Sequence, residues 1–334
     1  MKFYKLLFFS SLMFGSILAI SSFSWFSMWM GLEINLLSII PLMSSKKNIY
    51  PAESAIKYFI TQTIASSIIL VAIMINLNLL EFIPQDFNIF LNTMMNSGFL
   101  MKMGAAPFHF WFPEIMEGLD WLMCLTMLTW QKIAPMVLLM SNLKISLFLC
   151  LIIMFSSFIS GIQGINQISM RKIMAYSSIN HIGWMLASMM HSQTTWLVYF
   201  LTYSLISTNL VFVLYNLNIF FLKQLFNSLN FKKLLKFMFG LNFLSLGGLP
   251  PFLGFMPKWL TVNFLIQNDL FIVSLILIIF TLVTLYYYLR ISANSMVLYS
   301  SEILMKNFYI KNNILIFNAI TLSALILCSF ILNF

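Results

Sequence analysis

Long apolar runs follow one another along almost the whole chain, and they constrain its fold more than any other feature of the sequence. Each run continues for about twenty residues without alternation, which is the length of an α-helix that crosses a bilayer. A transmembrane β-strand would instead alternate apolar and polar residues over about ten positions. Only 8% of the residues are charged, against about a quarter in soluble domains. The sequence therefore predicts an all-α polytopic membrane protein.

We predict eleven transmembrane helices, separated by short polar, proline-containing or glycine-containing segments. The connections are too short to hold a soluble domain, so the chain, 1–334, is expected to be a single transmembrane domain. The predicted spans are residues 3–21, 24–43, 55–79, 88–112, 121–141, 145–164, 172–190, 195–221, 236–266, 270–292 and 313–333.

The basic residues predict the orientation of these spans. When the connections are placed alternately on two sides, thirteen lysines and arginines fall on the side of the N-terminus and one, Lys144, falls on the other. Such a bias marks the cytoplasmic or matrix side of a membrane protein. Because these residues lie in short loops between spans, the net charge of +9 indicates orientation and gives no reason to expect a nucleic-acid partner.

The three cysteines, Cys124, Cys150 and Cys328, lie in apolar spans and show no metal-binding spacing. Buried cysteines in such surroundings usually behave as small hydrophobic residues. The sequence therefore predicts no disulfide framework, iron–sulfur cluster or zinc site in this chain.

Glycine and proline interrupt two of the predicted spans. The interruptions lie at Gly104 and Pro107 in the fourth span and at Gly248, Pro250 and Pro251 in the ninth. These residues leave backbone carbonyls without intrahelical partners. A membrane tolerates such breaks only where protein or water supplies the missing partners, so we expect the breaks to border a functional site.

The two interrupted spans are similar to each other at a constant offset. Residues 99–108 align without gaps on residues 243–252, and Pro113 falls on Pro257 at the same offset of 144 residues. The alternative is that glycine and proline clusters arose independently in two membrane helices, where both residues are common.

This offset predicts an internal repeat. Residues 1–141 and 145–293 are expected to form two five-helix repeats, with the helix at 313–333 left over. An odd number of spans in each repeat inverts the second copy relative to the first. Inverted repeats with a discontinuous helix, here the fourth of each half, are typical of ion-translocating transporters.

Four ionisable side chains lie well inside the predicted spans: Glu33, Lys102, Lys132 and Lys258. Each costs roughly 2.5–3.5 kcal/mol at the centre of a membrane helix, so each is expected to be paired or functional. Static salt bridges between helices are one interpretation, but one glutamate cannot neutralise three lysines. Burial favours the neutral form of an amine, and a nearby carboxylate favours the charged form. The four residues therefore predict a proton relay.

Two histidines are further candidates for this relay. His109 directly follows the first break, and His181 shares a polar stripe with Tyr176, Ser177 and Ser178. His181 either conducts protons or only forms a hydrogen bond with a neighbouring helix, and the sequence leaves both interpretations open.

Five segments around these residues resemble a known family. They are residues 29–35 (WMGLEIN), 102–111 (KMGAAPFHFW), 130–135 (WQKIAP), 175–184 (AYSSINHIGW) and 247–255 (GGLPPFLGF), followed by Lys258. With these segments the chain resembles the chain 2 family of mitochondrial NADH:ubiquinone oxidoreductase, respiratory complex I. That family is antiporter-like and is related to Mrp-type sodium/proton antiporters. The resemblance covers essentially the whole chain.

The resemblance implies a core membrane subunit that translocates protons at the membrane midplane, driven by electron transfer from NADH to ubiquinone in partner subunits. It implies that Glu33 pairs with Lys102, that Lys132 lies on a central hydrophilic axis and that Lys258 serves the exit-side half-channel. Some antiporter-like relatives have glutamate in place of Lys258, so this sequence departs from them there. A free-standing cation/proton antiporter and a structural membrane scaffold are the alternatives.

The resemblance also implies where the chain works and with what. The location is the mitochondrial inner membrane with the N-terminus in the matrix, and the partners are other membrane subunits of complex I, membrane lipids and protons. NADH, FMN, iron–sulfur clusters and ubiquinone are expected in other subunits, with no cofactor in this chain. The abundance of methionine (25) and phenylalanine (35) also suggests an organelle-encoded protein.

Overall fold

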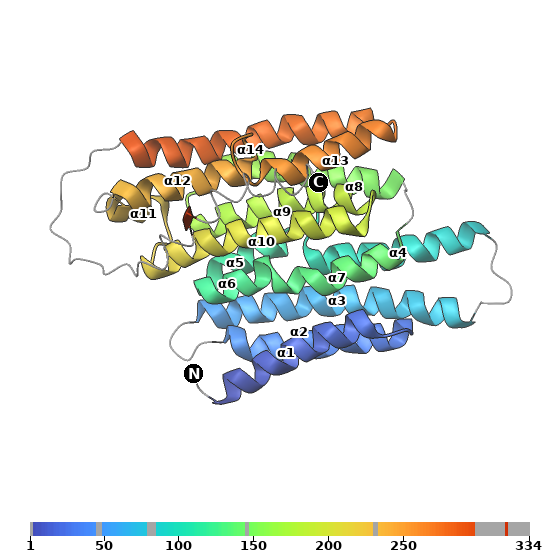
Figure 1. The fold of residues 1–334 in the computed structure, drawn as a ribbon. Coiled ribbons are helices and arrows are strands. Elements are labelled where there is room, and N and C mark those ends of the chain that lie inside the picture. Colours follow the sequence, from blue (N-terminus) through green and yellow to red (C-terminus); the bar gives the residue numbers. More distant parts are fainter. Residues whose placement is uncertain are drawn as a thin grey trace. The chain divides into compact units, whose positions relative to one another are not determined.

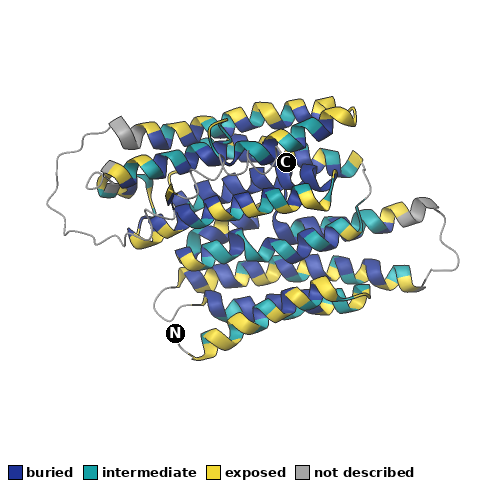
Figure 2. Cartoon of the chain, viewed as in Figure 1, coloured by how far each residue is buried: buried dark blue, intermediate teal, exposed yellow. Residues whose placement is uncertain are grey.

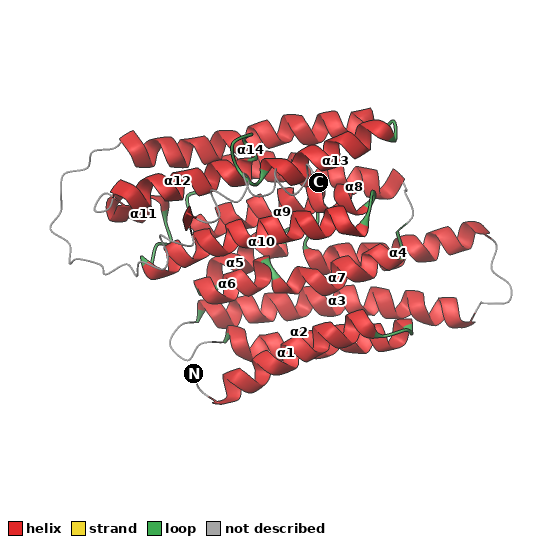
Figure 3. Ribbon diagram, viewed as in Figure 1, coloured by secondary structure: helices red, strands yellow, loops and turns green. Residues whose placement is uncertain are grey.

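The computed structural model describes residues 3–44, 49–78, 85–143, 147–229, 233–297 and 318–319. Fourteen α-helices, α1 to α14, account for most of these residues, and none of the described residues forms a strand (Figure 3). A helix satisfies its own backbone hydrogen bonds, as a bilayer requires. The predicted all-α fold is confirmed.

The chain divides into two compact units, Met1–Phe148 and Leu149–Phe334. The first unit contains seven helices. They are α1 (Phe3–Ser21), α2 (Trp25–Met43), α3 (Tyr50–Asn78), α4 (Gln85–Met103), α5 (Trp111–Gly118), α6 (Trp121–Leu128) and α7 (Trp130–Ser141). Within this unit α3 packs against α2, α4 and α5, and α7 packs against α1, α4 and α6 (Figure 1). Helices α3 and α7 thus contact most of the other helices of the unit.

The second unit holds the later helices. They are α8 (Leu147–Ile165), which begins two residues before the unit, α9 (Met170–Met189), α10 (Gln193–Asn216), α11 (Leu222–Leu229), α12 (Lys233–Gly247), α13 (Phe255–Gln267) and α14 (Phe271–Val297). Helix α9 contacts α10, α13 and α14, and α12 packs against α10 and α14. Nearly every residue of α9 is buried (Figure 2), which explains how this helix can carry polar side chains all round.

Large apolar side chains are also exposed on the surface, among them Phe14, Leu37, Phe158 and Ile272. Lipid is the solvent that such a surface fits. Seven helical stretches within the described ranges are long and apolar enough to cross a membrane. They are Phe3–Ser21, Trp25–Met43, Tyr50–Leu77, Trp121–Ser141, Leu147–Ile165, Gln193–Asn216 and Phe271–Ala293.

The predicted number of eleven spans remains a prediction. Three other predicted spans fall on α4, α9 and the α12–α13 pair. These helices are interrupted or too polar to count as long apolar helices that could cross a membrane. The eleventh, 313–333, lies outside the described residues except for 318–319, which are helical.

One predicted connection contains a helix. Residues 222–235 lie between the eighth and ninth predicted spans, and α11 occupies Leu222–Leu229 of this connection. Leu222, Leu225 and Phe226 recur at the spacing of one helical face, and Leu225 is fully buried. This short periodic pattern was the signal for the helix.

Candidate functional site

Each predicted break is a helix end closed by a glycine with left-handed backbone. Gly104 has φ +76° and Gly248 has φ +78°, a conformation that glycine adopts without a steric penalty. The Gly104 N–H donates to the carbonyl of Met101 at 3.2 Å, and the Ala105 N–H donates to that of Leu100 at 3.0 Å. These two bonds form a Schellman motif, which satisfies carbonyls at the end of α4.

The same two bonds recur 144 residues later. The Gly248 N–H donates to Ser245 at 3.0 Å, and the Leu249 N–H donates to Leu244 at 3.4 Å. The helix ends keep this offset too, because α4 and α12 end, and α5 and α13 begin, at equivalent residues. The two breaks therefore have the same local structure.

The prolines take two different places around the breaks. Pro107, Pro250 and Pro251 lie in the turns that follow the glycines. Pro113 and Pro257, which align with each other at the same offset, are each the third residue of the next helix. A helix leaves the N–H groups of its first turn unpaired, so these two prolines are compatible with α5 and α13 and do not break them.

A small polar cavity of about 10 Å³ lies beside Lys102 in the first unit, about the room that one water molecule needs. Its wall combines side chains from α2, α3, α4 and α7. They are Leu32, Asn35, Leu36, Tyr58, Gln62, Lys102, Gln131 and Pro135. Lys102 is 7% exposed and lies in the last turn of α4, just before the break.

Gln131 connects two neighbouring helices across this cavity. Its Nε2 donates to Oδ1 of Asn35 at 2.8 Å, and its Oε1 accepts a longer bond from the Tyr58 hydroxyl at 3.5 Å. Gln62 donates to the main-chain carbonyl of Lys102, also at 3.5 Å. None of these four polar side chains was predicted to belong to the site. Their signal was polarity at single positions in otherwise apolar spans.

Glu33 lies in α2, two residues before Asn35. Its Oε1 is buried and has no hydrogen-bond partner in the protein. The charges of Glu33 and Lys102 interact through space. Within the described part of the chain no ion pair within 4.0 Å joins them. Buried polar atoms nearly always have a partner in protein or ordered water, so a water molecule is the natural neighbour of this oxygen.

Lys132 is 1% exposed and lies in the first turn of α7. Its Nζ is 5.6 Å from the centre of the Phe112 ring, within the range of a cation–π contact. The fifth span, expected to be continuous over 121–141, is interrupted at Thr129, where α6 ends and α7 follows. The sequence carried one signal near this point. Pro135 cannot donate the hydrogen bond that the Gln131 carbonyl would otherwise accept in a helix.

His109 lies in the turn between α4 and α5 and is 1% exposed. Its Nδ1 is 3.2 Å from the carbonyl of Pro107, and its ring lies 4.3 Å from that of Phe110. The His109 carbonyl accepts a hydrogen bond from the Phe112 N–H at 3.0 Å. His109 and Lys132 therefore both contact Phe112. Phe112 follows the first break in the chain, whereas Lys102 precedes it.

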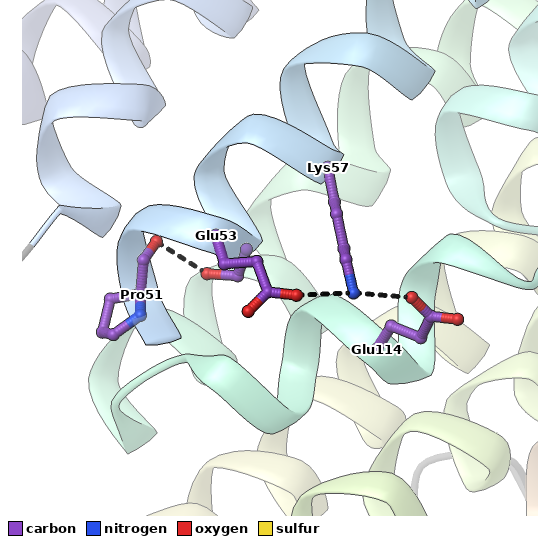
Figure 4. A network of polar contacts seen from close by, with 5 residues as sticks. Pro51, Glu53, Lys57 and Glu114 are labelled. Atoms are coloured by element: carbon purple, nitrogen blue, oxygen red, sulfur yellow. Dashed lines mark hydrogen bonds and ion pairs between the residues drawn. The ribbon is translucent and has the colours of Figure 1, made fainter. Parts of the chain in front are cut away.

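An ion-pair cluster joins α3 to the helix that follows the first break. Lys57 Nζ lies 3.0 Å from Glu53 Oε1 and 2.9 Å from Glu114 Oε2 (Figure 4). Glu53 and Lys57 are four residues apart on α3, a spacing that favours an ion pair. Glu114 is in the first turn of α5. All three side chains are roughly half exposed, so the cluster lies at the surface of the unit.

In the second unit, Lys258 binds the end of the broken helix α12. Its Nζ donates to the carbonyls of Leu246 at 3.1 Å and Gly247 at 2.9 Å, and the side chain is 7% exposed. The ammonium also lies 5.8 Å from the centre of the Trp184 ring. The C-terminal end of a helix carries partial negative charge. Half-helix ends of this kind hold cations in transporters.

His181 is 4% exposed on α9, in the same unit as Lys258. Its Nδ1 lies 2.9 Å from the Tyr199 hydroxyl, and its ring is 5.0 Å from that of Tyr203. The predicted relay residues thus fall into two groups. The first unit holds Glu33, Lys102, His109 and Lys132, and the second holds His181 and Lys258.

No group of three or more His, Cys, Asp or Glu residues within the described ranges could hold a metal ion. Cys124 is buried and Cys150 is partly buried, and neither is in a disulfide bond. Cys328 lies outside the described residues.

Comparison with known proteins finds a family and close relatives. The family model described as NADH:quinone oxidoreductase/Mrp antiporter, TM, matches residues 22–284. NADH-ubiquinone oxidoreductase chain 2 of Locusta migratoria is 48% identical over 298 residues, which cover 89% of this chain and 87% of the relative. The protein of the same name in Anopheles gambiae is 48% identical over 330 residues, 96% and 95% of the two chains.

A solved structure has the same fold. It is a chain of respiratory complex I from Thermus thermophilus with bound aureothin, with a TM-score of 0.86 and 23% sequence identity. The match covers 96% of the present chain and 78% of that chain.

Proposed function

Because this chain belongs to the NADH:quinone oxidoreductase/Mrp antiporter family, we propose that it is a membrane subunit of respiratory complex I. Relatives that match it over nearly their whole length are named NADH-ubiquinone oxidoreductase chain 2. In this role the chain translocates protons, and electron transfer from NADH to ubiquinone in partner subunits supplies the energy. The oxidoreductase activity belongs to the whole complex.

The observation that carries the proton-transfer role is the surroundings of Glu33 and Lys102. A carboxylate with a buried, unpartnered oxygen and a lysine in a polar cavity interact without direct contact. A fixed salt bridge would hold both groups in contact. Groups that influence each other without touching can instead exchange a proton through intervening water, and the Coulomb energy between them depends on their separation.

Lys132 and Lys258 extend this relay. Both are deeply buried lysines, and an ionisable residue inside the membrane is by default a candidate for an ion or proton pathway. The His109 carbonyl and Lys132 both meet Phe112, and His181 lies in the same unit as Lys258. We assign all six residues to the proton pathway.

The two breaks support a repeated architecture. Gly104 and Gly248 have the same left-handed conformation and the same hydrogen bonds at an offset of 144 residues. Together with the strong bias of basic residues, this favours two inverted five-helix repeats, eleven spans in total and an N-terminus in the matrix. The membrane is the mitochondrial inner membrane. Other complex I membrane subunits and lipids surround the chain, and NADH, FMN, iron–sulfur clusters and ubiquinone bind elsewhere in the complex.

A free-standing cation/proton antiporter is the second candidate, since the family includes Mrp antiporters. The relatives at 38–48% identity favour the complex I role. Reconstitution separates the two, because an antiporter retains cation/proton exchange when the purified chain is alone in liposomes, whereas the subunit does not.

Replacement of Lys132 by methionine tests the relay. Methionine keeps the apolar stem and removes the ammonium group, so the complex should assemble while fewer protons are pumped for each NADH oxidised. Lys223→Met is the matched control, because Lys223 is exposed on α11. An unchanged ratio of protons to electrons with neutral residues at both Lys102 and Lys132 contradicts the relay and leaves a structural scaffold.

A further inference from the structure

Four buried tyrosines in the second unit have no role in the relay described so far. Tyr199 and Tyr203 are on α10 and Tyr287 and Tyr288 on α14, and none is more than 2% exposed. Both helices pack against α9, which carries His181. Buried tyrosine hydroxyls need hydrogen-bond partners, so four in one place require a local network.

The hydroxyls on α10 bind the polar stripe of α9. The Tyr199 hydroxyl lies 2.9 Å from His181 Nδ1. The Tyr203 hydroxyl is hydrogen-bonded to Ser178, and the Tyr203 ring packs 5.0 Å from that of His181. The stripe that the sequence analysis noted on α9 therefore faces phenol groups in the folded unit.

The hydroxyls on α14 bind the same stripe one residue earlier. Tyr288 is hydrogen-bonded to Ser177, and the Tyr287 hydroxyl donates to that of Tyr288 at 3.4 Å. Tyr288 also lies within electrostatic range of Tyr199 and Tyr203. The two pairs of tyrosines thus form one cluster, which we call the phenol cluster: Tyr199, Tyr203, Tyr287 and Tyr288.

The phenol cluster borders the Lys258 site. Gly247, whose carbonyl accepts a hydrogen bond from Lys258, faces Tyr288 so closely that a Cβ on the glycine would lie 3.6 Å from the ring. Trp184, whose ring lies near the Lys258 ammonium, is one helical turn from His181 on α9.

Two buried polar atoms at this border have no partner in the protein. They are Nε1 of Trp184 and Oδ1 of Asn180. Such atoms are usually satisfied by ordered water. We therefore expect ordered water beside these two atoms of α9.

We propose that the phenol cluster and His181 form a proton-conducting path that serves Lys258, an inference that rests on the proposed function. A hydroxyl accepts a proton on its oxygen while its own proton moves to the next acceptor. One O–H bond forms as one breaks, and no phenolate remains. The imidazole of His181 accepts a proton at one nitrogen and releases one at the other.

Removal of hydroxyls without removal of rings tests the proposal. The double variant Tyr199→Phe/Tyr288→Phe keeps the aromatic packing and interrupts the path on both helices. Its matched control is Tyr215→Phe/Tyr286→Phe, on the same two helices, where both side chains are exposed. Purified complex I with each variant chain is reconstituted in liposomes, and protons pumped per electron are measured together with the amount of assembled complex.

The path predicts that the double variant assembles like the control but pumps fewer protons per electron. It also predicts a larger slowing in deuterated water than for the control, because proton transfer then limits turnover. A parallel Lys258→Met variant distinguishes failure of the proposed path from failure of the relay through Lys258. If that variant loses pumping and the double variant does not, the cluster is only structural and the proposal is overturned. If neither loses pumping, the relay through Lys258 itself is wrong.

The single variants are used if the double variant does not assemble. If Tyr199→Phe and Tyr288→Phe each prevent assembly of the complex, the hydroxyls stabilise the fold and the proposal is overturned. If the single variants assemble, a graded decrease of the ratio from single to double variant supports it.

Discussion

Replacement of Gly248 by alanine tests whether the Lys258 ammonium must rest on the end of α12. The glycine has φ +78°, and a Cβ at this position would lie 2.8 Å from Cδ and 3.0 Å from Nζ of Lys258. Alanine therefore has two effects at once. It strains the backbone, and it forces the lysine away from the carbonyls of Leu246 and Gly247.

The two effects can be given magnitudes. The left-handed conformation costs an alanine about 1–2 kcal/mol. A hydrogen bond from a charged donor contributes about 1.5–3 kcal/mol, and Lys258 makes two of them with the α12 carbonyls. Because the flexible lysine can recover part of this energy in a new position, we expect a destabilisation of at least about 2 kcal/mol. That is roughly a 30-fold change in the ratio of folded to unfolded chain.

The assay compares assembled complex and protons pumped per electron for Gly248→Ala and Gly247→Ala. A Cβ on Gly247 would meet nothing closer than 3.4 Å, and the residue ends a regular helix. Gly247→Ala should therefore be neutral or stabilise α12 by about 0.5–1 kcal/mol. Gly248→Ala should lower both readouts. Equal assembly and equal pumping in the two variants would refute the argument that Lys258 depends on this contact.

Three further predictions concern the first unit. Gln131→Leu removes the amide that binds Asn35 of α2 and Tyr58 of α3. It leaves the Asn35 Oδ1 acceptor unpaired, which costs about 1–3 kcal/mol, so thermal inactivation of the complex should occur at a lower temperature. An unchanged temperature contradicts this. Pro135→Ala restores an N–H that can bind the Gln131 carbonyl, so α7 should straighten, Lys132 should shift and fewer protons should be pumped per electron without loss of assembly. Lys57→Met removes both exposed ion pairs (Figure 4). Because such pairs contribute little to stability, assembly and pumping should match those of the parent complex at low and high salt. A decrease in either would mean that the ion pairs are needed for assembly or pumping.

The helix breaks could be predicted from the sequence because their cause is local. Gly104 and Gly248 lie in left-handed conformations that few other residues adopt, and each is followed by prolines that cannot continue a helix. The ends of α4 and α12 and the starts of α5 and α13 follow from these residues. The charged residues inside apolar spans could also be identified from the sequence, since each is a single charged residue in an otherwise apolar segment.

The surroundings of those charges could not be predicted, because they depend on which helix faces meet. Gln131 and Asn35 are 96 positions apart in sequence, and a single polar residue in an apolar span does not reveal its partner. The interruption at Thr129 was missed for a related reason. Pro135 lies six residues away, and a proline inside a helix can produce a kink, a break or no interruption at all, as Pro41 within α2 shows.

The Schellman bonds at Gly104 and Gly248 have a mechanical consequence. A helix break is often regarded as a hinge, but here the carbonyls of Leu100, Met101, Leu244 and Ser245 are already bound by the turn that follows. To bend at either point, the chain would have to release two backbone hydrogen bonds and move a glycine out of its turn. The breaks are therefore rigid turns. Motion that accompanies proton transfer should be sought in long side chains and water molecules, and the backbone of the discontinuous helices should stay fixed throughout the cycle.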